Sequence, residues 1–153
     1  MNINLQILLE KLKRNNLRFR LMDEKTTMIS SKDVEKIFKG DPREIWKTLV
    51  ATDEKNFFAA FLCGRDRLNL QKMEKALGVS GLRMANAKGL KEKLKIQPGE
   101  VCPLSINLPL VCDSSIIAFG KVNFGSGDTE YGIEMQVVDI LKFLKPKVMD
   151  IRE

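Results

Sequence analysis

The segment Phe57–Cys63 constrains the fold most, because all seven of its residues are apolar. A strand with one wet face alternates apolar and polar residues, whereas a short apolar run is typical of a strand covered on both faces. The segment Glu44–Thr52 also has the character of a strand, and only Asp53–Lys55 separates it from the second predicted strand, Asn56–Cys63. We therefore expect two consecutive strands, the second at the centre of a sheet.

Helical and strand patterns share the rest of the chain. Leucines recur with helical spacing from Leu5 to Leu12, and capping residues predict helices that begin at Ser30, Asn69 and Asn86. Further strands are predicted at 17–22, 82–85, 108–113, 116–123 and 130–136, followed by a helix at 137–144 and an edge strand at 147–151. This order predicts a mixed α/β (α+β) fold: a single curled, barrel-like mixed sheet flanked by helices, in one domain spanning residues 1–153.

Composition narrows the classes of function. The chain has no histidine, which excludes Ser-His-Asp and Cys-His catalysis. Its three cysteines lack metal-site spacing, so we expect no metal and no cofactor. No apolar run is long enough to span a bilayer and no signal peptide is evident, which favours the cytoplasm. The net charge of +6 favours a polyanionic partner, although solvated lysine-rich helix faces explain it equally simply.

Lys47 is the strongest candidate for a functional-site residue. Strand alternation places it on one face with Ile45, Leu49 and Ala51. A cation on a mostly apolar face is costly unless an anion or hydrogen-bond acceptors meet it. The alternative is a side chain whose stem extends along the sheet to the surface.

Two glycine-containing loops and one carboxylate are further candidates. The loop Gly99–Pro103 has a Gly-x-x-x-Pro spacing, which suits close approach to a phosphate or carbonyl group but also fits an ordinary turn. The turn Asn123–Gly127 fits either a phosphate cradle or a plain hairpin. Glu134 is either a ligand for an amine or a solvated strand carboxylate. Cys102 has no base to activate it, so we interpret it as lining a pocket or the core.

Four segments in order carry a resemblance to a known family: Lys47–Val50, Leu68–Ala85, Pro98–Leu104, and Val122–Gly127 with Gly132–Glu134. Together they resemble the YbaK-like, prolyl-tRNA-synthetase-associated (ProX-type) domain, a family of aminoacyl-tRNA deacylases. The resemblance extends from about Leu5 to Leu144. It implies a freestanding editing domain that hydrolyses the ester between a wrong, small amino acid, such as alanine or cysteine, and the 3′ end of a tRNA, most simply tRNA-Pro.

The resemblance also implies roles for individual residues. Lys47 and Gly99 are the expected catalytic residues. The expected substrate-binding residues are Thr48, Val101, Cys102, Pro103, Asn123, Gly125, Ser126 and Glu134. The acceptor end of an aminoacyl-tRNA is the expected partner, with an aminoacyl-tRNA synthetase as a second. The nucleophile is either a bound water or the side chain of the substrate itself.

Two other functions stay open at this level. A non-catalytic module that binds tRNA, a nucleotide or a synthetase would use the same cleft without turnover. A small-molecule hydrolase unrelated to tRNA would bind its substrate with little dependence on salt.

Overall fold

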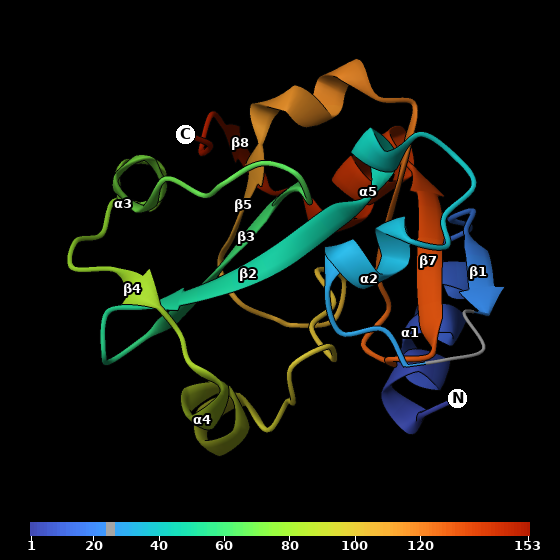
Figure 1. The fold of residues 1–153 in the computed structure, drawn as a ribbon, viewed down its shortest axis with the longest axis horizontal. Coiled ribbons are helices and arrows are strands. Elements are labelled where there is room, and N and C mark those ends of the chain that lie inside the picture. Colours follow the sequence, from blue (N-terminus) through green and yellow to red (C-terminus); the bar gives the residue numbers. More distant parts are fainter. Residues whose placement is uncertain (24–26) are drawn as a thin grey trace.

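The structure is a computed structural model that describes residues 1–23 and 27–153. Two β-sheets lie side by side with helices around them (Figure 1). The strands are β1 (Arg20–Asp23), β2 (Trp46–Thr52), β3 (Phe57–Cys63), β4 (Arg83–Met84), β5 (Leu110–Asp113), β6 (Lys121–Gly125), β7 (Tyr131–Gln136) and β8 (Lys147–Met149). The helices are α1 (Ile3–Arg14), α2 (Ser31–Glu35), α3 (Leu70–Leu77), α4 (Ala87–Gly89) and α5 (Val137–Leu144), with short turns η1 (Pro42–Glu44), η2 (Leu90–Leu94) and η3 (Ser114–Ala118).

The larger sheet has the order β4-β2-β3-β5-β8, so β3 is its middle strand. Every residue of β3 from Phe58 to Cys63 is buried, which confirms the central strand expected from the apolar run. β2 pairs antiparallel with β3, whereas β5 runs parallel to both β3 and β8. One face of this sheet packs on α3 through a cluster that contains Ala60, Leu62, Met73 and Ala76.

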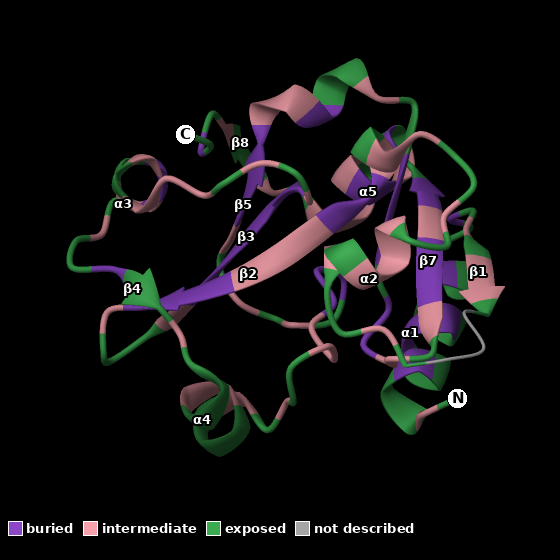
Figure 2. Ribbon diagram, in the orientation of Figure 1, coloured by how far each residue is buried: buried purple, intermediate pink, exposed green. Residues whose placement is uncertain are grey.

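The smaller sheet is antiparallel, with the order β1-β7-β6. Its buried face packs against the leucine stripe of α1 and against α5, and Figure 2 shows buried and partly buried stretches alternating along β7. The ring of Phe61 from the larger sheet joins this core, because its centroid lies 5.3 Å from that of Trp46 and 5.6 Å from that of Phe124. Apolar packing therefore holds the two sheets together.

The expectation of one curled, barrel-like sheet is wrong. Between the described residues of the two sheets, strand pairing is reduced to one isolated parallel bridge between Ile45 and Asn123. On the same edge of β2, β4 pairs only with Ala51 and Thr52 at the far end. The hydrogen-bonded ladder therefore stops between these two points, and the sheets remain separate.

Local signals were more reliable than topology. Ser30 and Asp33 form the predicted capping box, and Asn69 caps α3, which ends at Gly78 with φ +70°. The expected strand at 116–123 is wrong in its first half, because the buried carboxylate of Asp113 accepts hydrogen bonds from Ser115 and begins η3 instead. The helix that begins after Ser30 ends at Glu35 rather than near Gly40, and none of its residues is buried. Among the described residues, no helix has the length and apolar character needed to cross a bilayer.

Candidate functional site

A cavity of about 260 Å³ lies where the two sheets separate. Its walls come from the first half of β2, the segment 28–34 that leads into α2, the loop residues Gly99 and Val101, the end of β6, and residues 128–132. In Figure 1, α2 lies in front of the space between β2 and β7. The site therefore combines residues from segments far apart in the sequence.

The open edge of β2 creates one wall of this cavity. The carbonyl of Ile45 accepts from Gly64 on the β3 side, whereas the carbonyl of Val50 accepts from Ala85 on the opposite side. Alternation along the strand then directs the backbone N–H and C=O of Thr48 away from β3, toward the open edge. Figure 2 shows the consequence, since residues 47–49 are only partly buried between buried neighbours.

Glycines allow the backbone of the loop at 99–101 to lie close to the other walls of the cavity. Gly125 and Gly132 face each other in the ladder of the small sheet, and a Cβ at Gly125 would lie 3.1 Å from the carbonyl oxygen of Val101. Gly99 has φ +88°, and a Cβ there would lie 3.1 Å from Cγ2 of Thr129 and 3.2 Å from Cα of Ile29. Glycine in a strand or turn often marks such a close approach of two backbones.

Lys47 is held at the cavity by backbone carbonyls. Its Nζ donates to the carbonyl oxygen of Gly64 at 3.1 Å and to that of Asp66 at 2.7 Å. Burial lowers the pKa of Lys47, although nearby Cys63 and Asp66 oppose that effect. An ammonium group has three N–H bonds, and the described part of the chain supplies acceptors for two of them. The third can meet a ligand.

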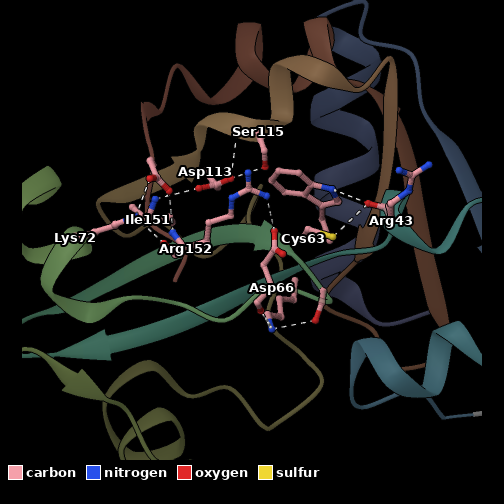
Figure 3. A network of polar contacts seen from close by, with 12 residues as sticks. Arg43, Cys63, Asp66, Lys72, Asp113, Ser115, Ile151 and Arg152 are labelled. Carbon is pink, nitrogen blue, oxygen red and sulfur yellow. Dashed lines mark hydrogen bonds and ion pairs between the residues drawn. The ribbon is translucent and has the colours of Figure 1, made fainter.

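A polar network fixes the turn that holds Lys47 (Figure 3). The side chain of Arg152 pairs with the carboxylate of Asp66 at 3.3 Å, and Lys72 donates to the carbonyl of Arg152 at 2.8 Å. The buried carboxylate of Asp113 accepts from the backbone N–H of Ile151 at 3.0 Å. The final residues of the chain therefore help to position the carbonyls that orient Lys47.

Two side chains of the cavity wall carry buried polar atoms that lack a well-formed hydrogen bond. Oγ1 of Thr48 and both amide atoms of Asn123 form no hydrogen bond of normal geometry with any described residue. Asn123 lies opposite Glu134 in the ladder and contributes slightly to lowering the pKa of that carboxyl. Leaving such a group buried without a partner costs about 1–3 kcal/mol, so both are suited to bind a polar ligand.

The structure brings together six of the ten predicted site residues: Lys47, Thr48, Gly99, Val101, Asn123 and Gly125 all line the cavity. The other four lie outside it. Cys102 is buried in the larger core, where burial raises the pKa of its thiol to about 11. Pro103 lines a separate groove with Cys102, and the hydroxyl of Ser126 donates within its own turn.

Glu134 is already paired, because Arg20 donates to its carboxylate at 3.0 and 3.3 Å and Lys121 lies 3.8 Å away. Partial burial would raise the pKa of Glu134, but the hydrogen bond and charge of Arg20 outweigh it and lower the pKa. The roles of these ten residues stay predictions.

Sequence reasoning missed the apolar part of the site. Met22, Met28, Ile29, Val34 and Tyr131 line the cavity, and no local pattern distinguishes them from ordinary core residues. One signal was available, since Gly132 falls inside the predicted strand 130–136 and a glycine within a strand indicates close backbone approach.

Comparison with known proteins identifies the family. A sequence model of the aminoacyl-tRNA editing domain matches residues 24–143, well over half of the chain. A proline–tRNA ligase of Sulfurihydrogenibium sp. (strain YO3AOP1) is 30% identical over 103 residues, which cover 67% of this chain and 18% of the ligase. This chain therefore spans less than a fifth of that relative.

Two solved structures share the fold across nearly the whole chain. The hypothetical protein APE2540 superposes with a TM-score of 0.86 at 25% identity, covering 95% of this chain and 99% of the other. A proposed trans-editing enzyme for prolyl tRNA synthetase superposes with a TM-score of 0.80 at 21% identity, covering 100% and 99%. With the sequence match, these findings confirm the family resemblance: the chain belongs to the aminoacyl-tRNA editing domain family.

Proposed function

We propose that this protein hydrolyses the ester of a mischarged tRNA that carries a small amino acid. The observation that carries the proposal is the convergence of Lys47, Thr48 and Gly99 on one small cavity. Membership of the editing-domain family supplies the class of substrate. On this proposal the aminoacyl group and the terminal ribose occupy the cavity.

The chemistry needs no strong base. Water attacks the carbonyl carbon of the ester, the bond from that carbon to the ribose oxygen breaks, and the proton from water passes to the ribose oxygen. Lys47 uses its third N–H to bind the ribose or terminal phosphate. The backbone amide of Gly99 or Val101 stabilises the charge that develops on the carbonyl oxygen, since the amide of Glu100 already donates to Gln97. Donors placed in this way contribute about 2.7–4 kcal/mol each in other enzymes.

The walls of the cavity support selection for a small side chain. Its volume of about 260 Å³ lies just below the range of typical ligand pockets, which is roughly 300–1,000 Å³. Apolar side chains from Met22, Met28 and Val34 limit the space. Alanine and cysteine are the amino acids that fit this description, and tRNA-Pro is the carrier that the ligase relative suggests. A cysteinyl substrate would allow its own thiol to attack the ester in place of water.

A deacylation panel tests the proposal. Purified protein is incubated with tRNA-Pro charged with alanine, cysteine, serine or proline, and the loss of each ester is followed against the spontaneous rate. We expect hydrolysis of the alanyl or cysteinyl ester and none of the prolyl ester. Binding of every species without turnover would instead assign the chain to a non-catalytic tRNA-binding role.

A further inference from the structure

A second concavity lies on the other side of the Gly99–Pro103 loop. It is a wide groove of about 1,340 Å³ between α1, the loop that follows η2, and the end of α5. The range typical of small-molecule pockets is roughly 300–1,000 Å³, so the groove is too large and open to enclose a metabolite. Its size suits a macromolecule.

The charge along the groove is strongly positive. Five lysines line it, Lys11, Lys95, Lys142, Lys145 and Lys147, and all five are exposed. Glu100 is the acidic residue in its lining, and Oε1 of that side chain already accepts from the backbone N–H of Gln97 at 2.7 Å. The groove thus presents cations with almost no compensating anion.

The lysines of the groove take part in none of the described ion pairs. In residues 1–23 and 27–153, nine ion pairs involve seven arginines and the lysines Lys72 and Lys121, and none involves a lysine of the groove. Lys11 lies over the ring of Phe143, 5.4 Å from its centroid, a contact that leaves its charge uncompensated. The charges of the five groove lysines are therefore free to meet an anion.

The groove and the catalytic cavity share a wall. Val101 lines both, and Gly127 of the groove lies against the loop, since a Cβ there would be 3.5 Å from the carbonyl oxygen of Glu100. A ligand that enters the cavity at one side of the loop can therefore continue into the groove at the other side. A charged polymer with a small reactive end has this shape.

We infer that the groove binds the phosphate backbone of the tRNA acceptor stem while the acylated 3′ end occupies the cavity. This inference rests on the proposed function for the identity of the RNA. Rows of unpaired lysines neutralise phosphates without reading sequence, and such binding weakens steeply with salt.

The test measures binding of an uncharged tRNA-Pro transcript, so that its outcome does not depend on ester hydrolysis. Dissociation constants are determined between about 50 and 200 mM salt for the wild type, for Lys142→Gln/Lys147→Gln, and for a matched control, Lys55→Gln/Lys75→Gln. Lys55 lies in the turn between β2 and β3, and Lys75 lies on the exposed side of α3. Both double variants lose the same net charge.

We expect the groove variant to bind more weakly and to lose about 2 units from the slope of log K against log salt, since each phosphate contact contributes about 0.9. The control variant should keep the wild-type slope. Equal slopes for the two variants, or a wild-type slope near zero, would overturn the inference. Loss of a stable complex with prolyl-tRNA synthetase in the groove variant, with the RNA slope unchanged, would assign the groove to a protein and overturn it as well. Failure of the proposed function is a separate result, namely no hydrolysis by the wild type in the deacylation panel.

Discussion

Replacing Lys47 by methionine tests the centre of the proposed site. Methionine keeps a similar length and apolar stem but removes the ammonium group, so the two hydrogen bonds to the carbonyls of Gly64 and Asp66 are lost. Hydrogen bonds from charged donors contribute about 1.5–3 kcal/mol each, but water can reach this partly exposed side chain and replace some of that loss. We expect the free energy of unfolding to fall by about 1–2 kcal/mol.

The effect on catalysis should be larger than the effect on stability. Removal of the third N–H of Lys47, which holds the ribose or terminal phosphate in the proposal, should slow deacylation by about 10–150-fold, because a hydrogen bond from a charged donor contributes about 1.5–3 kcal/mol. The assay is single-turnover deacylation of alanyl-tRNA, with unfolding in urea as the measure of fold. Lys55→Met, which removes an exposed lysine away from the cavity, is the matched control and should deacylate at the wild-type rate. A folded Lys47→Met protein that keeps its rate within threefold would falsify the role given to Lys47.

Three further predictions follow from the same geometry. Asn123→Leu removes a buried amide without a described partner, so the free energy of unfolding should stay unchanged or rise by about 1 kcal/mol while deacylation falls; a loss above 2 kcal/mol in urea unfolding would contradict this. Gly99→Ala should lower the free energy of unfolding by about 1–3 kcal/mol and slow deacylation, because φ is +88° and the new Cβ would lie 3.1 Å from Thr129. Its control is Gly78→Ala, at φ +70° with open space around it, which should lower the free energy of unfolding by about 1 kcal/mol and leave the rate of deacylation intact. Equal rates for the two variants would argue against a role for the Gly99 loop. Burial raises the pKa of Cys102 from its ordinary value near 9 to about 11, so the stability that its protonated thiol contributes is complete below pH 9 and is lost as pH rises toward 11. Between pH 8 and pH 11, the free energy of unfolding of Cys102→Ala should therefore fall by about 2–3 kcal/mol less than that of the wild type. An equal fall in the two proteins would refute the buried thiol.

The features that the sequence predicted correctly are those set by residues close together in the chain. The capping box of Ser30 and Asp33 and the αL stop at Gly78 act within one helical turn, so their signals are local and complete. The apolar run Phe57–Cys63 predicted a central strand because burial on both faces needs no knowledge of the partner strands. Lys47 could be chosen for the same reason, since a cation on an apolar face stands out without a structure.

The features that the sequence did not predict depend on contacts between segments far apart in the chain. The choice between one sheet and two rests on the bridge from Ile45 to Asn123, which no local pattern encodes. The acceptors of Lys47 are backbone carbonyls, and every residue type carries one, so Gly64 and Asp66 gave no signal. The carboxylate of Asp113 likewise begins η3 through its own hydrogen bonds, so the next strand starts only at Lys121.

The single bridge between the two sheets has an evolutionary consequence. Each sheet keeps its register through its own ladder and its own packing, whereas the span of the gap between them depends on a few side chains at the junction. Substitutions at that junction can widen or narrow the cavity while both ladders stay intact. On the proposed function, such changes would alter which amino acid the cavity admits without rebuilding either sheet.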